Sequence, residues 1–209
     1  MLRSAGLSPT PEQLSLLLEY KARLLEWNAT TNLISQGTIE TFDRVHILDS
    51  LLPLRWLPEE GPIVDLGTGG GLPGIIIKIF RPHIRVTLAE SKSRKIKFLQ
   101  KAVAALNLEG LDVLNPTLEK PQAVYRVLVS RAFGTLEKIT REAKRYLAPG
   151  GCIFAYKGRE ATVREELREL AAAWHPELFG YSCAVTAAET EEAERTVVLL
   201  RKDTGRNHT

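Results

Sequence analysis

A glycine-rich stretch at residues 63–74 holds the residue types best suited to binding a ligand. A short apolar run reaches Asp65 and Leu66, four glycines follow within residues 67–71, and an apolar segment begins at Leu72. This order is typical of a buried parallel strand that turns directly into a helix facing a ligand. Glycines suit the turn because it needs unusual backbone angles and leaves room for the ligand. The unpaired N–H groups at the helix start therefore predict a site for a nucleotide-like cofactor.

Two classes of cofactor fit this stretch. Residues 69–74 read G-x-G-x-x-G, the fingerprint of dinucleotide binding. The longer run from Asp65, D-x-G-x-G-x-G, resembles motif I of the S-adenosylmethionine-dependent methyltransferases, which implies that Asp65 helps to position the methionine part. Glu90 ends the next expected strand, where an acid accepts hydrogen bonds from ribose hydroxyls in either class. A glycine-rich turn without a ligand is the third interpretation.

The segment 147–155, L-A-P-G-G-C-I-F-A, favours the methyltransferase interpretation. It resembles the L-x-P-G-G transition that leads from a helix into strand 5 of class I methyltransferases. The exit of strand 4, S-R-A-F at 130–133, differs from the Asn/Asp-Pro-Pro-aromatic turn of adenine amino-methyltransferases. Cys152 lacks the Pro-Cys context of cytosine-C5 enzymes, which need a nucleophilic thiol.

The elements that must position these residues alternate between strand and helix patterns. Strands are expected at 63–66, 85–89, 111–114, 127–129 and 152–156, and helices at 72–80, 92–107, 135–147 and 160–173. Two further strands around 179–186 and 195–202 would end the sheet as an antiparallel hairpin. The fold class predicted is α/β, the class I methyltransferase fold, which is Rossmann-like with a seven-stranded sheet covered on both faces.

An N-terminal helical extension over residues 1–61 is expected to precede a methyltransferase domain over 62–209. Its first helix should begin at Thr10-Pro11 because Thr10 is a good N-cap and proline suits the first turn. A loop is expected from Asn28 to Gly37. Thr38 is expected to cap a second helix that carries Phe42, Val45, Ile47 and Leu48.

Composition is that of an ordinary globular protein, with 209 residues and 44% hydrophobic side chains. No apolar run approaches the ~20 residues that cross a bilayer, and the first ten residues lack the apolar core of a signal peptide. We expect a cytoplasmic monomer without a membrane partner. Cys152 and Cys183 have no metal-ligand spacing, so buried thiols and no metal are expected.

Positive charge gathers beside the glycine stretch. Between Ile75 and Lys101 there are eight lysines and arginines against one acid, Glu90. Such a basic segment is the expected footprint of a polyanionic substrate. Because Arg94, Lys97 and Lys101 follow helical spacing, a solvated helix face explains part of it.

Several short segments resemble the bacterial 16S rRNA guanine-N7 methyltransferase family, called RsmG or GidB. They are Asn32-Leu33, R-V-H-I-L-D-S at 44–50, the glycine stretch, Glu90-Ser91 with the basic residues 92–97, S-R-A-F at 130–133 and Lys157-Gly158. The H-I-L-D-S and S-R-A-F segments are far more specific than the glycine stretch. The resemblance covers roughly residues 10–160, and the C-terminal third matches only in general pattern.

The resemblance implies S-adenosylmethionine as cofactor, a specific guanine in the decoding-region hairpin of 16S rRNA as substrate, and the small ribosomal subunit or its assembly intermediate as partner. It implies these cofactor-binding residues: Asp65, Gly67, Thr68, Gly69, Gly71, Leu72, Glu90, Ser91, Leu118, Glu119 and Arg131. The expected RNA-binding residues are Lys92, Arg94, Lys95, Lys97 and Lys157. Arg131 is expected to close the pocket near the reacting centre as a positioning group.

The chemistry of guanine N7 needs no general base, because this nitrogen has an exposed lone pair and carries no proton. Two positions depart from the family: Glu90 stands where aspartate is usual, and Thr117 where arginine is frequent. His46 and Asp49 stand three apart and share a helix face, either as a packing pair or as a substrate contact. A small-molecule methyltransferase and a non-catalytic nucleotide-binding module are the alternative functions.

Overall fold

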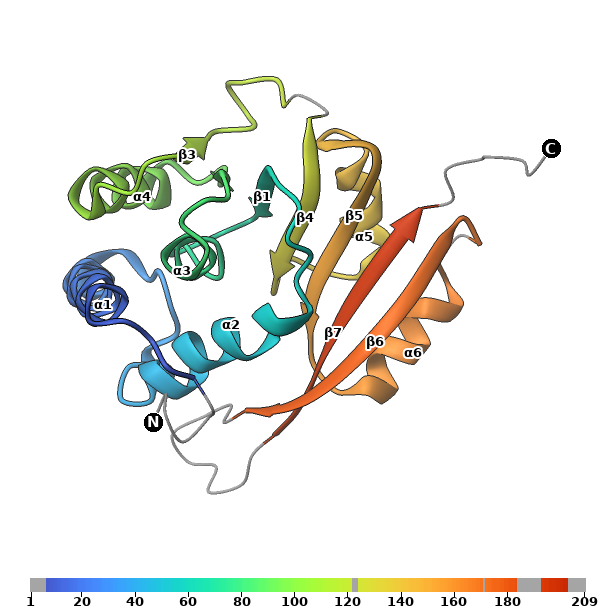
Figure 1. Ribbon diagram of the computed structural model, residues 1–209, viewed down its shortest axis with the longest axis horizontal. Coiled ribbons are helices and arrows are strands. Elements are labelled where there is room, and N and C mark those ends of the chain that lie inside the picture. Colours follow the sequence, from blue (N-terminus) through green and yellow to red (C-terminus); the bar gives the residue numbers. More distant parts are fainter. Residues whose placement is uncertain (1–6, 122–123, 171, 184–192, 203–209) are drawn as a thin grey trace.

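A seven-stranded sheet forms the centre of the molecule in the computed structural model, which describes residues 7–121, 124–170, 172–183 and 193–202 (Figure 1). The strand order is β3-β2-β1-β4-β5-β7-β6. Strand β7 runs antiparallel to both β5 and β6, and the other pairs are parallel. The predicted fold class, with its antiparallel final hairpin, is confirmed. The strands are β1 (Ile63–Leu66), β2 (Val86–Ala89), β3 (Leu111–Leu114), β4 (Tyr125–Arg131), β5 (Leu147–Lys157), β6 (Trp174–Cys183) and β7 (Ala193–Lys202).

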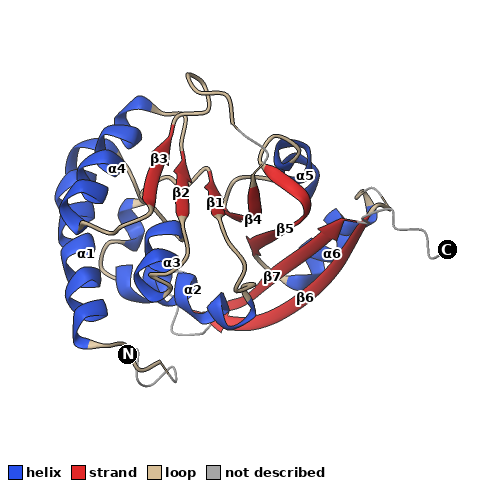
Figure 2. Cartoon of the chain, turned by 45° about the horizontal axis from the view of Figure 1, so that its top comes forward, coloured by secondary structure: helices blue, strands red, loops and turns tan. Residues whose placement is uncertain are grey.

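Helices cover both faces of the sheet (Figure 2). On one face lie α1 (Pro11–Thr31), α3 (Gly74–Phe80) and α4 (Ser93–Leu106), and on the other α5 (Leu136–Ala143) and α6 (Glu160–Arg168). Side chains of successive strand residues point to opposite faces of the sheet. Ile63 therefore packs in the core under α3, whereas Val64 packs in the core under α5. This burial on both sides explains why the central strands are almost continuously apolar.

Helix α1 begins where the sequence predicts and ends later. The Thr10 hydroxyl accepts from the Gln13 backbone N–H, and the Gln13 side chain accepts from the Thr10 N–H, a complete capping box. The expected loop start at Asn28 is wrong because Asn28 is buried within the helix. Its side-chain oxygen accepts from the Ile34 N–H at 2.9 Å, and the helix ends only at Asn32, with φ 47°.

The second helical segment spans residues 43–56 and packs in the same hydrophobic core as α1 and α3. It consists of a π-helical piece η3 (Asp43–Leu48), one turn α2 (Asp49–Leu51) and a 3-10 piece η4 (Leu52–Trp56). Thr38 does not cap it; this residue ends a separate 3-10 turn, η2 (Gln36–Thr38). Its hydroxyl instead contacts His46 Nε2 at 2.9 Å and donates to the Ser35 carbonyl at 2.7 Å, so a tertiary contact replaces the expected cap.

Other boundaries differ at the ends of elements. Helix α5 stops at Ala143 and β5 begins at Leu147, because Leu147 already pairs with Tyr125 ahead of a register shift. Helix α6 stops at Arg168 and β6 begins at Trp174, which pairs with Lys202. The expected strand residues 184–186 lie outside the described residues. Both cysteines are buried, as predicted, and the Cys183 thiol donates to the Arg44 carbonyl at 3.2 Å.

The described part of the chain contains no helix long and apolar enough to span a membrane and no cluster of His, Cys, Asp or Glu able to hold a metal ion.

One hydrophobic core extends across the expected division at residues 61 and 62. Tyr20, Leu24 and Phe42 from the N-terminal part share a cluster with Ile75 and Leu99 of the sheet domain. The division itself stays a prediction. The shared core indicates that the N-terminal helices support the sheet domain directly.

Candidate active site

Asp65 lies beneath the glycine turn, residues 67–71, and ties its two ends together. One carboxylate oxygen, Oδ2, accepts from the Thr68 hydroxyl at 2.6 Å and from the Gly74 N–H at 2.8 Å. The other oxygen, Oδ1, is buried without a hydrogen-bond partner among the described residues. Burial raises the pKa of Asp65 to about 6, against the opposing effect of the bonds from Thr68 and Gly74. Asp65 therefore shapes the turn from inside the protein.

The glycine turn requires glycine at Gly67. This residue has φ +70°, and a Cβ placed on it would lie 2.4 Å from the Phe133 ring. Phe133 follows the end of β4, so the turn after β1 is pressed against the loop after β4. Ala132, in the same loop, has a positive φ of 56°, an uncommon conformation for a residue with a side chain.

Helix α1 supports the same turn from the other side. The Tyr20 hydroxyl donates to the Gly70 carbonyl at 2.7 Å, and both atoms are buried. A Cβ on Gly70 would lie 3.1 Å from a Leu24 methyl group. Sequence reasoning did not find Tyr20, because an amphipathic helix pattern does not reveal which element its polar atoms will meet.

Glu90 follows β2, as predicted, and connects the exit of this strand with the glycine turn. Its carboxylate accepts from the Gly69 N–H at 3.1 Å and from the N–H groups of Ser91 and Lys92 at 2.8 and 2.9 Å. The side chain is nearly buried at the carboxyl edge of the sheet. Its acceptor oxygens thus lie where ligands bind in open parallel sheets.

A cleft of about 450 Å³, here called the cofactor cleft, opens between the exits of β1, β2 and β4. Of the residues implied by the resemblance, Gly67, Glu90 and Ser91 line it, together with Lys92. Leu118 is 83% exposed, and neither it nor Glu119 belongs to the lining. The full lining is Leu66, Gly67, Ala89, Glu90, Ser91, Lys92, Pro116, Thr117, Ala132, Phe133, Lys138, Glu142, Arg145 and Tyr146.

The loop after β3 thus contributes Pro116 and Thr117 to the cleft, one or two residues earlier than expected. Asn115 sets this geometry, because its side-chain oxygen accepts from both the N–H and the hydroxyl of Thr117. A contact from Leu118 or Glu119 to the adenine stays a prediction.

A second cavity of about 340 Å³, here called the arginine pocket, lies beside the cofactor cleft. The two cavities share Ala132 and Phe133, so the loop after β4 is their common wall. The lining of the arginine pocket is Val45, His46, Asp49, Arg131, Ala132, Phe133, Gly134, Ile139, Tyr156, Lys157, Gly158, Tyr181 and Arg195.

Arg131 is held by the helical segment 43–56. Its Nη1 donates to Asp49 Oδ2 at 3.0 Å and to the Val45 carbonyl at 3.4 Å, and its Nη2 contacts His46 Nδ1 at 3.2 Å. His46 and Asp49, which share a helix face as predicted, therefore meet the same guanidinium. No partner for Nε occurs among the residues that the structure describes, so its N–H group remains as a donor for a ligand.

The partners of His46 determine its protonation. Arg131 can only donate, so Nδ1 must accept, and Nε2 carries the proton toward the Thr38 hydroxyl. Burial, followed by the charge of Arg131, lowers the pKa of His46 to about 4, against the opposing effect of Asp49. His46 is thus a neutral imidazole at physiological pH.

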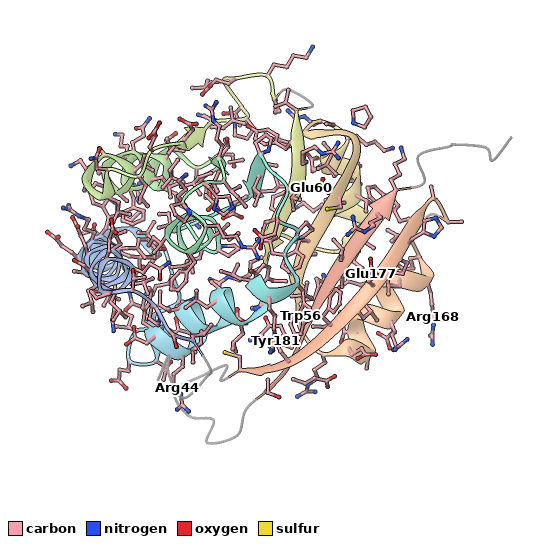
Figure 3. All side chains as sticks on the ribbon, in the orientation of Figure 1. Arg44, Trp56, Glu60, Arg168, Glu177 and Tyr181 are labelled. Atoms are coloured by element: carbon pink, nitrogen blue, oxygen red, sulfur yellow. The ribbon has the colours of Figure 1, made fainter. Side chains whose placement is uncertain are left out.

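Asp49 also receives residues from the C-terminal hairpin. The Tyr181 hydroxyl donates to Asp49 Oδ1 at 2.8 Å, and Arg195 Nε lies 3.9 Å from the same oxygen. Tyr181 comes from β6 where this strand approaches the 43–56 segment (Figure 3). Sequence reasoning missed both residues, because they belong to an unremarkable hairpin far along the chain.

The basic residues expected to bind RNA occupy two different environments. Lys92, Arg94 and Lys97 are exposed at the start of α4, and Lys95 Nζ lies 3.6 Å from the position of a Cβ on Gly69. Lys157, in contrast, is held within the protein.

The Lys157 amine pairs with Glu166 at 2.8 Å and donates to the Gly134 carbonyl at 2.9 Å, with only 11% of the side chain exposed. This amine fixes the loop after β4, and Glu166 also accepts from the Leu136 N–H at the start of α5. An RNA contact by Lys157 stays a prediction.

The fold is the class I methyltransferase fold. A methyltransferase from Pyrococcus furiosus superposes with a TM-score of 0.60 over 87% of this chain and 96% of its own, at 15% identity. A predicted O-methyltransferase from Agrobacterium tumefaciens superposes with a TM-score of 0.53 over 75% of this chain and 79% of its own, at 19% identity. These likenesses concern the fold.

The family follows from sequence similarity. The model of the GidB family, described as rRNA small subunit methyltransferase G, matches residues 13–194, and the chain belongs to this family. Ribosomal RNA small subunit methyltransferase G 1 of Syntrophobacter fumaroxidans is 37% identical over 168 residues, 75% of each chain. Its counterpart in Bordetella avium is 31% identical over 97% of this chain and 91% of its own.

The cofactor cleft suits S-adenosylmethionine, the cofactor of this class. Glu90 supplies carboxylate oxygens for a ribose diol, and the glycine turn gives a ligand close access to the backbone. Phe133 and Tyr146 provide aromatic walls.

Gly67→Ala should weaken S-adenosylmethionine binding at least about tenfold, equivalent to about 1.4 kcal/mol. The new methyl group would meet Phe133 at 2.4 Å, and φ +70° disfavours any L side chain by about 1–2 kcal/mol. Titration calorimetry measures the affinity. Gly180→Ala is the matched control, because this glycine has open space around it. Equal affinity of the two variants would contradict the required close approach.

His46 should make the protein less stable as pH falls. Its folded pKa of about 4 lies below the ordinary 6.5, so the unfolded chain binds the extra proton in this window. This stabilisation is fully present above pH 6.5, and about 3 kcal/mol of it should be lost by pH 4. Urea unfolding of wild type and His46→Gln at both ends of the window measures the difference.

Wild type and His46→Gln must be compared at each pH, because protonation of Asp65 changes the free energy of unfolding in the opposite direction. Its raised pKa adds stability as pH falls from about 6, and this contribution cancels between wild type and variant. His83→Gln serves as control, since that side chain is 67% exposed. If the free energy of unfolding changes with pH in the same way in wild type and His46→Gln, His46 is not held neutral in the folded protein.

Proposed function

We propose that this protein transfers the methyl group of S-adenosylmethionine to N7 of a guanine in 16S rRNA. Membership of the small-subunit rRNA methyltransferase family supports the rRNA substrate. The observation that carries the choice of N7 is the absence of a free proton acceptor among the described residues of the arginine pocket. A nucleophile that brings no proton suits such a pocket.

Each candidate base in the pocket already has a partner. Both nitrogens of His46 and both oxygens of Asp49 are engaged, and the Tyr156 hydroxyl donates to the Ser50 carbonyl. Burial, followed by the nearby Asp49 carboxylate, raises the pKa of Tyr181. An amine or hydroxyl substrate, which must lose a proton, finds no general base here.

The cofactor, when bound, supplies an electrophilic methyl group whose transfer to a ring nitrogen moves one positive charge from sulfonium to purine. The protein's own part is to orient the reactants and to exclude water. The Nε–H group of Arg131, which has no partner among the described residues, is a charged donor for guanine O6 or a phosphate oxygen. Phe133 separates the two reactants' cavities and gives each of them an apolar wall.

The start of α4 supports a polyanionic partner. Cations are favoured at the C-terminus of a helix and disfavoured at its N-terminus, yet the first turns of α4 carry Lys92, Arg94, Lys95 and Lys97 without an acid. The arrangement lowers local helix stability in exchange for positive charge beside the cofactor cleft. A small-molecule methyltransferase would need no such surface. We place the protein in the cytoplasm, where rRNA is made, and as a monomer.

Nucleoside mass spectrometry and primer extension on 16S rRNA test this function. Cells that lack the protein should lose one 7-methylguanosine, and wild-type protein should restore it. Arg131→Ala should lower the transfer rate on the order of 10²-fold, the scale for a misplaced reactant, and Arg131→Lys should recover little. Arg23→Ala, on the far surface of α1, is the control. A methyl group on another atom, or an unchanged nucleoside profile, would refute the proposal.

Charge reversal at the start of α4 should weaken RNA binding. Changing Lys92, Arg94 and Lys97 to Glu removes cations that displace counterions from RNA, so the affinity should fall and its salt dependence should flatten. Filter binding at several salt concentrations measures both effects. Arg85, Arg201 and Lys202 lie at the opposite edge of the sheet, and their reversal to Glu is the control. If both triple variants behave alike, RNA does not bind on α4.

A further inference from the structure

We propose that Asp49 is the counter-charge of this active site, which keeps Arg131 from repelling a positively charged cofactor and product. The inference rests on the proposed methyl transfer to N7, in which the cation moves from one reactant to the other and never leaves the site. Arginine is useful there as a planar donor, but its charge has the wrong sign. A carboxylate in permanent contact removes that conflict.

The position of Asp49 is fixed from three sides. Arg131 from β4 and Tyr181 from β6 bind its two oxygens at 3.0 and 2.8 Å, and Arg195 from β7 lies 3.9 Å away. Only 11% of the Asp49 side chain and 16% of the Arg131 side chain are exposed. The pair is therefore poorly screened by solvent, and its charges act at short range on whatever occupies the pocket.

Asp49 is the one acid among the described residues that line the arginine pocket. Against it stand Arg131, Arg195 and Lys157, of which Lys157 has its own partner in Glu166. His46 stays neutral and contributes no charge. Loss of the Asp49 charge would leave the guanidinium groups of Arg131 and Arg195 uncompensated in the arginine pocket.

The charge of Arg131 acts as far as the glycine turn. Burial raises the pKa of Asp65 and of Tyr20, which both lie beneath that turn, and the positive charge of Arg131 opposes this rise in both. Residues 132 and 133, immediately after Arg131, line the cofactor cleft as well as the pocket. A change in the net charge of the Arg131–Asp49 pair should therefore alter how tightly a cationic ligand binds in the cleft.

Two cofactor forms separate this electrostatic role from a structural one. S-adenosylmethionine is a sulfonium cation, whereas S-adenosylhomocysteine lacks the methyl group and that charge. In Asp49→Asn, the Kd of the cation should rise about fivefold relative to that of the neutral form, the scale of a partly screened charge several ångströms away. Calorimetry without RNA measures both constants on one preparation, so any unfolded fraction cancels in the ratio.

Arg131→Gln provides the opposite test. It should lower the ratio of the S-adenosylmethionine Kd to the S-adenosylhomocysteine Kd below that of wild type, because Asp49 then remains with Tyr181 and Arg195 alone. This variant leaves Asp49 partnered, so it keeps the proposal testable if Asp49→Asn does not fold. The double variant should return the ratio toward the wild-type value.

Asp43→Asn is the matched control. It removes the same charge from the same helical segment, where Asp43 pairs with Lys21 at 2.7 Å and is 47% exposed. Its ratio should equal that of wild type. An unchanged ratio in both Asp49→Asn and Arg131→Gln, or an equal shift in Asp43→Asn, would overturn the proposal. Such a result would leave the wild-type assay for 7-methylguanosine unaffected, so the two proposals fail separately.

Discussion

A buried carboxylate, that of Asp65, holds the turn on which the active site is built. Its bonds to Thr68 and Gly74 join the start of the glycine turn to the first residue of α3. With the turn fixed, Gly67 can lie against Phe133 and Gly69 can donate to Glu90, which brings the exits of three strands together. Burying this charge costs stability, and the two donated hydrogen bonds offset part of that cost.

The N-terminal helices hold two parts of the active site in place. Helix α1 holds the glycine turn through Tyr20, and the 43–56 segment holds Arg131 through His46 and Asp49. Neither contact involves residues close in sequence. The active site thus depends on a tertiary arrangement in which the helical extension and the sheet share one core.

Local sequence patterns predicted those parts of the fold that local forces determine. The strand at 63–66 and the glycine turn follow from apolar runs and backbone freedom, and the Thr10 cap follows from hydrogen bonds between residues three apart. The same reasoning failed at Thr38 and Asn28, where a distant or forward contact replaces the local one. It also missed Tyr181 and Arg195, since pairing of β6 with β7 alone brings them to Asp49. The ion pair of Lys157 with Glu166 was likewise not predicted, because it joins the end of β5 to α6 and no local pattern indicates it.

The shared wall between the two cavities has a consequence for inhibitor chemistry. Ala132 and Phe133 line both the cofactor cleft and the arginine pocket, and the Lys138 amine lies 4.3 Å from the centre of the Phe133 ring. A single compound that carries an adenosine-like group and a purine would therefore need only a short linker to occupy both cavities. Such a bisubstrate ligand would gain affinity from each half without the entropy loss of binding two molecules.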